Sequence, residues 1–178
     1  MTYAQYRLLP DDGKRYELID GELLMTPAPS TRHQRILGNL FSELRAYVKA
    51  NGLGEVFVSP VDVVFEENLF LEPDIVYVSR HQQQIVGEEA IHGAPDLVVE
   101  VLSPSSFYHD LRRKMGLYSQ FGVQEYWIVD PEKQTLDLYR RAGNELQLFR
   151  QFASHETLES PLLPGFRLAV SDVFSEPR

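Results

Sequence analysis

The sequence predicts an α/β or α+β fold in which a mixed β-sheet is flanked by helices. Two segments have helical periodicity, and short runs of β-branched and aromatic residues lie before, between and after them. The chain has 178 residues, 43% of them hydrophobic, which is enough for one sizeable core and short for two. We therefore expect one domain over residues 1–178, with the order hairpin, helix, strands, helix, strands.

The first elements are a hairpin and a helix. RYELIDGELLMT has two β-like runs around Asp20-Gly21, a dipeptide that suits a tight turn, so we predict an amino-terminal hairpin over residues 15–26. From Ser30 to Ala50, apolar residues recur along one side of a helix, and Asn51-Gly52 ends it.

Strands follow this helix. EVFVSPVDVVF, interrupted at Pro60, and then EPDIVYV are rich in β-branched and aromatic residues and are flanked by turn formers. Residues 80–93 are polar and contain two glycines, so we interpret them as a linker. It leads to the apolar strand that opens near Asp96, in APDLVVEVLSPSS.

The second half repeats the alternation of helix and strand. SPSS can cap a helix from about Phe107 to Phe121, which Gly122 ends. QEYWIVD predicts a strand, and TLDLYRR with NELQLFRQF predicts a closing carboxy-terminal hairpin around Ala142-Gly143. We expect the tail after Phe166 to lie on the surface.

Composition narrows the chemistry. The chain has no cysteine, so a metal ion must be held by oxygen or imidazole, and Mg²⁺ suits oxygen ligands best. The net charge of −9 argues against broad adhesion to nucleic acid, although residues 112–114 and 140–141 are locally basic. The amino terminus lacks the features of a signal peptide and no apolar run could span a membrane, so the cytoplasm is the default location.

Glu100 is the unexpected residue, because it lies inside the apolar strand LVVEVL. Burying an unpaired carboxylate is costly, so such a residue is usually neutralised, paired or bound to a metal ion. Asp74 stands at the start of IVYV, and if the two strands are neighbours, both carboxylates can converge on one edge or face of the sheet. Lys114 lies in the following helix, with Asp110 four residues before it on the same face.

These residues resemble those of a known family. The pattern Pro73-Asp74, then DLVVEVLSPSS, then Asp110-x-x-x-Lys114, then GVQEYWIVDP is similar to that of the Uma-type endonucleases of the PD-(D/E)XK, or restriction-endonuclease-like, superfamily. The resemblance extends from RYELIDGELL through the YWIVDP strand.

The resemblance implies a restriction-endonuclease-like mixed sheet flanked by helices, and Mg²⁺-dependent hydrolysis of DNA phosphodiesters, with Mn²⁺ as an alternative ion. It implies Asp74 and Glu100 as metal ligands and catalytic residues, with Lys114 positioning or activating the water. Glu17 and His33 match the family's amino-terminal block and receive supporting roles, as does Asp110. Nucleases that cut both strands often pair their active sites, so the resemblance also implies a homodimer.

One position departs from the superfamily pattern. The lysine expected two residues after the acidic residue of the second strand is Leu102 here, and Lys114 is the candidate to replace it. The alternative is a catalytically silent relative that keeps the fold as a module for binding nucleic acid or protein. Leu102 and the acidic net charge both favour that alternative.

Other interpretations remain open for single residues. Glu100 can pair with an arginine, and Lys114 can be a solvated helix lysine paired with Asp110. Asp96 and Asp62 compete for the role of Asp74, although turn capping suits Asp96 better. Tyr126 and Trp127 can stack on bases, but we expect Trp127 in the core.

Overall fold

The structure is a computed structural model that describes residues 1–103 and 108–176, without the side chains of residues 108–110. Its larger sheet has six strands in the order β11-β10-β9-β8-β6-β3. β8 and β9 run parallel and the other neighbours are antiparallel, so the sheet is mixed, as predicted. The strands are β3 (Gly54–Val58), β6 (Ile75–Ser79), β8 (Leu97–Val101), β9 (Glu125–Asp130), β10 (Thr135–Ala142) and β11 (Glu145–Ala153).

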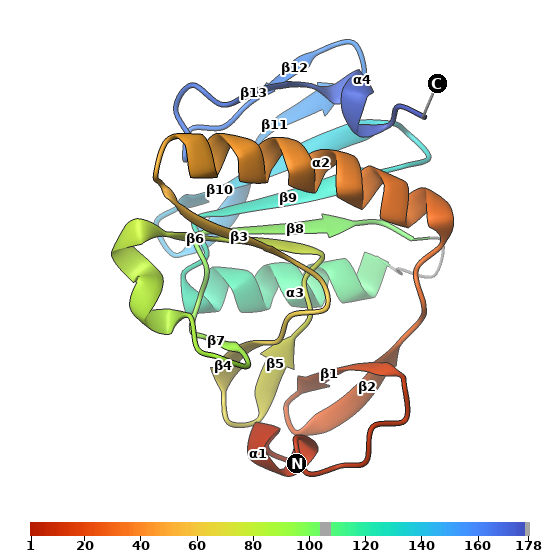
Figure 1. Cartoon of the computed structure of the whole chain (residues 1–178), viewed down its shortest axis with the longest axis vertical. Coiled ribbons are helices and arrows are strands. Elements are labelled where there is room, and N and C mark those ends of the chain that lie inside the picture. Colours follow the sequence, from red (N-terminus) through yellow and green to blue (C-terminus); the bar gives the residue numbers. More distant parts are fainter. Residues whose placement is uncertain (104–107, 177–178) are drawn as a thin grey trace.

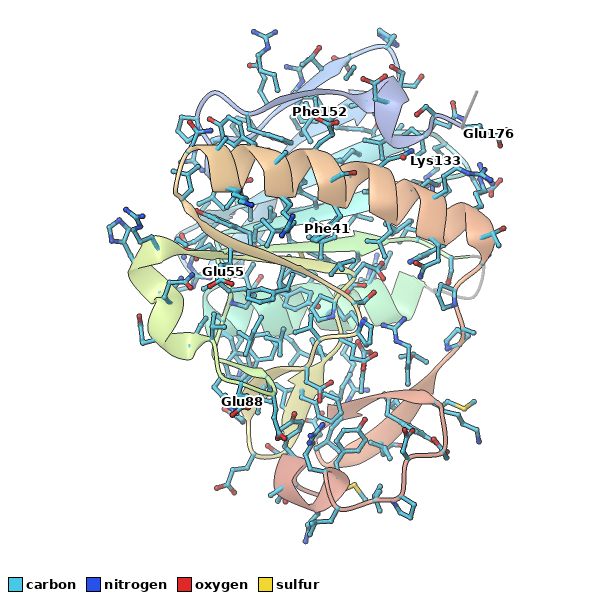
Figure 2. The ribbon with its side chains drawn as sticks, in the orientation of Figure 1. Phe41, Glu55, Glu88, Lys133, Phe152 and Glu176 are labelled. Atoms are coloured by element: carbon cyan, nitrogen blue, oxygen red, sulfur yellow. The ribbon has the colours of Figure 1, made fainter. Side chains whose placement is uncertain are left out.

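Two long helices cover opposite faces of this sheet: α2 (Thr31–Ala50) and α3 (Tyr108–Phe121) (Figure 1). Side chains fill the space between the sheet and the helices (Figure 2). Because side chains alternate along a strand, Leu97, Val99 and Val101 of β8 pack in the cluster of α2, while Val98 packs in the cluster of α3. Glu100 therefore belongs to the face that α3 covers, which explains how a carboxylate interrupts an apolar run without entering the core under α2.

The predicted helix at residues 30–50 is confirmed, and its ends follow from local chemistry. Ser30 is the N-cap, and its hydroxyl oxygen accepts a hydrogen bond of 3.1 Å from the backbone N–H of His33. Asn51 is the C-cap. The buried stripe consists of Ile36, Leu37, Leu40, Leu44 and Val48.

The amino-terminal hairpin is also confirmed, and it forms part of a second sheet. That sheet has five strands in the order β2-β1-β5-β4-β7. Asp20 and Gly21 both have positive φ, 55° and 78°, as a two-residue turn of this kind requires. The strands are β1 (Arg15–Ile19), β2 (Glu22–Thr26), β4 (Val63–Glu66), β5 (Leu69–Leu71) and β7 (Ile91–His92), and the short helix α1 (Tyr3–Tyr6) lies beside them (Figure 1).

Two predictions about loops are wrong. Residues 80–93 contain a 3-10 helix, η1 (Arg80–Ile85), and strand β7, so they are more than a linker. The Gln83 amide donates to the Val78 carbonyl at 3.2 Å, and Ile91 is 1% exposed, which fixes this segment against the sheets.

The tail after Phe166 is not a surface segment. It forms β13 (Arg167–Ala169), which pairs with β12 (Thr157–Glu159), and the short helix α4 (Val170–Val173). Val170 and Val173 are buried in the cluster of α2, so apolar residues near the chain end complete the core.

The closing hairpin of β10 and β11 and the burial of Trp127 are confirmed. Tyr126 is buried as well, because α3 covers its face of the sheet, and its ring contacts that of Tyr118 with centroids 4.9 Å apart. Neither Tyr126 nor Trp127 is therefore accessible for stacking on bases. The proposed cap SPSS falls mainly on residues 104–107, which lie outside the described residues. Among the helices that the structure describes, none is long and apolar enough to cross a membrane.

Candidate active site at the edge of the mixed sheet

Asp74 immediately precedes β6, and Glu100 lies on the neighbouring strand β8. β6 and β8 are antiparallel, with Ile75 opposite Val99. Extending this register by one residue places Asp74 opposite Glu100. The two strands are therefore neighbours, as the sequence analysis required for the two carboxylates to converge.

The Asp74 carboxylate is held at both oxygens. Its Oδ2 accepts the backbone N–H of Val101 at 2.8 Å, and its Oδ1 lies 3.1 Å from Nε2 of His33. Asp74 is 6% exposed, and His33 lies in the first turn of α2. The orientation of the carboxylate is thus fixed by a strand on one side and a helix on the other.

The Glu100 carboxylate is held by α3. Its Oε1 accepts hydrogen bonds from Nζ of Lys114 at 3.1 Å and from the hydroxyl of Tyr118 at 3.0 Å. Burial raises the pKa of Glu100 to about 7, because Lys114 only partly offsets desolvation, and the charges of Asp74 and Glu17 add to the increase. The site therefore carries more negative charge than its lysine neutralises.

Lys114 connects this carboxylate to the second sheet. Its Nζ lies 2.8 Å from Oε1 of Glu17 on β1, and the lysine is only 6% exposed. The interpretation of Lys114 as a solvated helix lysine is therefore wrong. The side chain of Asp110 lies outside the described residues, so its supporting role stays a prediction.

Some residues that contact the candidate site were not predicted from the sequence. Tyr118 is fully buried and follows Lys114 by four residues, so the helical spacing that singled out Lys114 could have found it. Glu72 donates its backbone N–H to Oε1 of Glu17 at 3.1 Å, and its carboxylate accepts from Nε of Arg15 at 2.6 Å. The contact of Arg15 with Glu72 joins residues far apart in the chain, and nothing in the sequence indicated it.

The competing carboxylates have structural partners elsewhere. Asp96 accepts the backbone N–H of Ser79 at 2.6 Å, and Asp62 accepts the hydroxyl of Tyr3 at 2.8 Å. The preference for a capping role of Asp96 is consistent with its contact.

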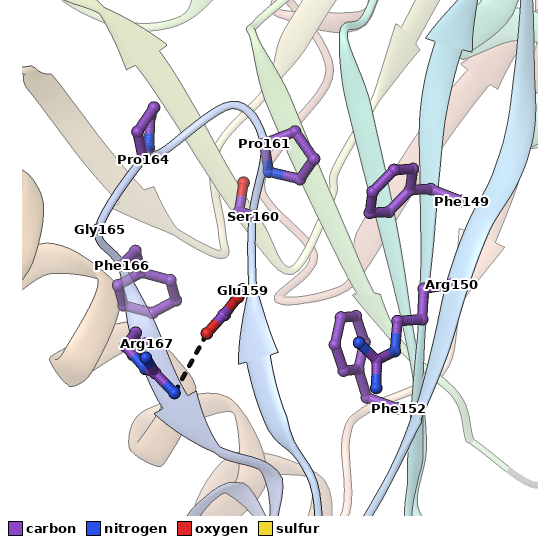
Figure 3. A pocket seen from close by; sticks show the side chains of 10 residues that line it. All are labelled: Phe149, Arg150, Phe152, Glu159, Ser160, Pro161, Pro164, Gly165, Phe166 and Arg167. Carbon is purple, nitrogen blue, oxygen red and sulfur yellow. Dashed lines mark ion pairs between the residues drawn. The ribbon is translucent and has the colours of Figure 1, made fainter.

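All the predicted site residues with described side chains line one pocket of about 290 Å³. These residues are Glu17, His33, Asp74, Glu100 and Lys114, and Leu102 lines the pocket with them. A different pocket, between β11 and the β12–β13 pair, contains none of them; its Glu159 pairs with Arg167 at 3.2 Å (Figure 3). The chemistry that the sequence predicted is therefore concentrated at the edge where β6 meets β8.

A divalent cation fits this pocket in charge and in donor type. Among the described residues, no three His, Cys, Asp or Glu side chains form a ready-made metal cluster. Mg²⁺ usually retains several waters, however, and needs only one or two carboxylates from the protein. Burial is the main cause of the raised pKa of Glu100, and the charges of Asp74 and Glu17 add to it; a bound cation would offset both effects.

The mixed sheet flanked by helices, with two acidic residues beside a buried lysine at its edge, is a nuclease-like fold. The chain belongs to the Uma2 family, described as "Putative restriction endonuclease", whose model matches residues 3–171.

The fold is shared with a solved structure. A "putative nuclease belonging to DUF820" from Anabaena variabilis superposes with a TM-score of 0.80 at 23% sequence identity, covering 98% of this chain and 97% of that one. No protein of curated function matches the chain.

Proposed function

We propose that this protein is a metal-dependent endonuclease that hydrolyses phosphodiester bonds of DNA, with Mg²⁺, or alternatively Mn²⁺, bound by Asp74 and Glu100. The observation that carries the proposal is the convergence of Glu17, Asp74 and Glu100 on one pocket in which Lys114 is buried. Membership of the Uma2 family supports the reaction class.

Mg²⁺ bound by these carboxylates would neutralise charge that builds up on the phosphate during hydrolysis. The chain's own groups supply the positioning. Val101 and His33 fix Asp74, and Lys114 with Tyr118 fixes Glu100, so the carboxylates need little rearrangement before they bind a cation.

Lys114 is the candidate to assist the attacking water. Its ammonium is the cationic group nearest to Glu100, and a phosphate approaching the pocket would meet it beside the carboxylates. It would orient the water or stabilise the negative charge of the transition state.

Cleavage of supercoiled and single-stranded DNA with Mg²⁺ or Mn²⁺ tests the proposal, together with calorimetric metal titration. We expect the wild-type protein to cut, and Glu100→Ala and Asp74→Asn to lose both metal binding and at least 100-fold in cleavage while remaining folded. Glu22→Ala, on an exposed position of β2, is the matched control and should cut like the wild type. Undiminished cleavage by Glu100→Ala would sink the proposal.

A catalytically silent module is the second candidate, because Leu102 occupies the position of the superfamily lysine. This candidate predicts that wild type and Glu100→Ala bind no metal and cut nothing. A homodimer stays a prediction of the family resemblance, which light scattering of the purified protein would test.

A further inference from the structure

A larger groove opens beside the carboxylate pocket. Its volume is about 870 Å³, within the range of small-ligand sites. Ser30, His33, Leu102, Ser103 and Leu111 line both cavities. The two cavities therefore lie side by side, and a strand of DNA that passes one of them also passes the other.

The groove exists because α3 leaves part of its sheet face uncovered. On β10, Asp137 lies opposite Ile128 and Tyr139 opposite Tyr126, so these residues face the same side of the sheet. α3 buries Tyr126 completely, whereas Tyr139 is only partly buried. The strip of sheet between α3 and β10 thus forms the floor of the groove.

The floor is apolar. Leu102 from the end of β8, Met115 from α3 and Ile128 from β9 line it, and Tyr139 adds an aromatic ring at its border. A flat, uncharged group of the size of a nucleobase can bury its faces against such a surface.

The rim carries charges of both signs, and its acidic residues have partners within the protein, such as Lys133, which pairs with Asp130 at 3.5 Å. Asp130 accepts the backbone N–H groups of Glu132 and Lys133 at 2.9 and 3.0 Å. Glu132 accepts from Arg32 at 2.6 Å, and Asp137 accepts from the amide of Gln151 at 2.7 Å.

Arg112 is the cation at this rim whose guanidinium can contact a phosphate, because Arg32 and Lys133 pair with acidic residues. It is exposed on α3, and within the described part of the chain it makes no ion pair. An apolar floor, an available guanidinium and a neighbouring carboxylate pocket together match one nucleotide, with its base, its backbone and the phosphate to be cut.

We infer that the groove binds an unpaired base of single-stranded DNA whose backbone passes the Asp74–Glu100 pocket; this inference rests on the proposed function. In a duplex, each base is stacked and paired, so it can enter the groove only if the duplex opens locally, which costs free energy. The protein therefore prefers single strands, or unpaired positions in duplexes, to continuous duplex.

Binding of fluorescent 12-nucleotide DNA, measured with Ca²⁺ in place of Mg²⁺, tests the inference on the full chain. We expect the single strand to bind at least tenfold more tightly than the matching duplex. An abasic strand of the same length should bind about 5- to 150-fold more weakly than the normal one, the factor that corresponds to about 1–3 kcal/mol of stacking per base.

Two pairs of variants localise the effect. Thr135→Trp fills the groove from β10 and should abolish the difference between normal and abasic strands, whereas Thr157→Trp, on an exposed position of β12, should not. Arg112→Ala should weaken single-strand binding severalfold. Arg113→Ala should not, because this neighbouring arginine pairs with Asp20 at 2.9 Å instead of lining the groove. Thermal unfolding verifies that each variant is folded.

The inference and the proposed function fail separately. If Thr135→Trp, folded, binds the strand like the wild type, or if abasic and normal strands bind equally, the groove does not take a base. If Glu100→Ala nevertheless abolishes cleavage, the proposed nuclease function is still supported. If binding depends on the bases and on Thr135 but nothing is cut with Mg²⁺ or Mn²⁺, the groove stands and the nuclease proposal falls.

Discussion

Nζ of Lys114 on α3 lies 2.8 Å from Oε1 of Glu17 on β1, in the interior of the protein. The same ammonium reaches Glu100 at 3.1 Å, so one lysine joins a helix and two sheets at the candidate site. The superfamily pattern places its lysine on the strand itself, where this chain has Leu102. Here the lysine beside the carboxylates is Lys114, which comes from helix α3 and not from the strand.

Replacing Lys114 by Met should damage both activity and stability. The change leaves Glu17 and Glu100 without their shared cation, and breaking a buried ion pair from one side costs about 3–5 kcal/mol. We expect cleavage to fall at least 100-fold and the free energy of unfolding to fall by about that amount. Denaturant unfolding and a DNA cleavage assay measure the two effects.

A second substitution distinguishes catalytic loss from structural loss. Leu102 lines the same pocket as Lys114, so Leu102→Lys in the Lys114→Met background returns an ammonium from the strand. We expect part of the cleavage activity to return. If the double variant is folded yet no more active than Lys114→Met, a lysine at this pocket is not what the reaction needs.

Much of this arrangement can be predicted from local patterns. Asp20-Gly21 predicted its hairpin because few dipeptides accept two positive φ angles, and the apolar stripe from Ile36 to Val48 predicted α2. Glu100 was noticeable because a carboxylate in an apolar strand needs a partner. These signals depend only on residues close together in the sequence.

The elements that were missed depend on distant contacts. β5 and β7 have three and two residues, too few for any periodicity, and their distant pairings, of β5 with β1 and of β7 with β4, complete the second sheet. Glu17 could be linked to the site through family resemblance, but its ion pair with Lys114 joins β1 of the second sheet to α3. Only the three-dimensional structure shows that contact.

Tyr118 should act on metal binding through Glu100. Its hydroxyl donates to Oε1 of Glu100 at 3.0 Å, so Tyr118→Phe removes one of the groups that orient this carboxylate. Partners of this kind affect metal affinity about 10- to 100-fold when removed. We expect Mg²⁺ to bind about tenfold more weakly by calorimetry, with a loss of about 1–3 kcal/mol in stability.

Tyr47→Phe is the matched control. The Tyr47 hydroxyl donates to the carbonyl of Pro164 at 2.6 Å, away from the pocket. This variant should leave the affinity for Mg²⁺ unchanged and lose less stability than Tyr118→Phe, because its hydrogen bond is exposed. Equal metal affinity in the two variants would show that Tyr118 has only a structural role.

Glu125 should matter for stability without affecting the candidate site. Its carboxylate is 1% exposed and accepts hydrogen bonds from Nε1 of Trp127, Oγ of Ser160 and the backbone N–H of Leu162. Glu125→Ala leaves the Trp127 and Ser160 donors unpaired, while the N–H of Leu162 keeps Oγ of Ser160 as an acceptor at 3.2 Å. We expect a loss of about 3 kcal/mol or more in unfolding free energy. Mg²⁺ affinity at 10 °C, where the variant should remain folded, ought to match the wild type; weaker binding would link this network to the site.

The pH dependence of stability should reveal the charge of Glu100. Because its pKa is raised to about 7 in the folded protein, while an unfolded glutamate titrates near 4.3, ionisation of Glu100 destabilises the metal-free fold. The penalty is absent below the unfolded pKa, grows as the pH rises between the two values and is complete above pH 7.

Glu100→Gln removes this penalty, so without metal the stability of this variant relative to the wild type should rise by about 1–3 kcal/mol between pH 5 and pH 8. Denaturant unfolding at both pH values measures this gain, and Glu22→Gln, on exposed β2, should show none. Added Mg²⁺ at pH 8 should stabilise the wild type but not Glu100→Gln. If Glu100→Gln shows the same difference from the wild type at both pH values, Glu100 has an ordinary pKa, and the excess negative charge that favours a cation is not there.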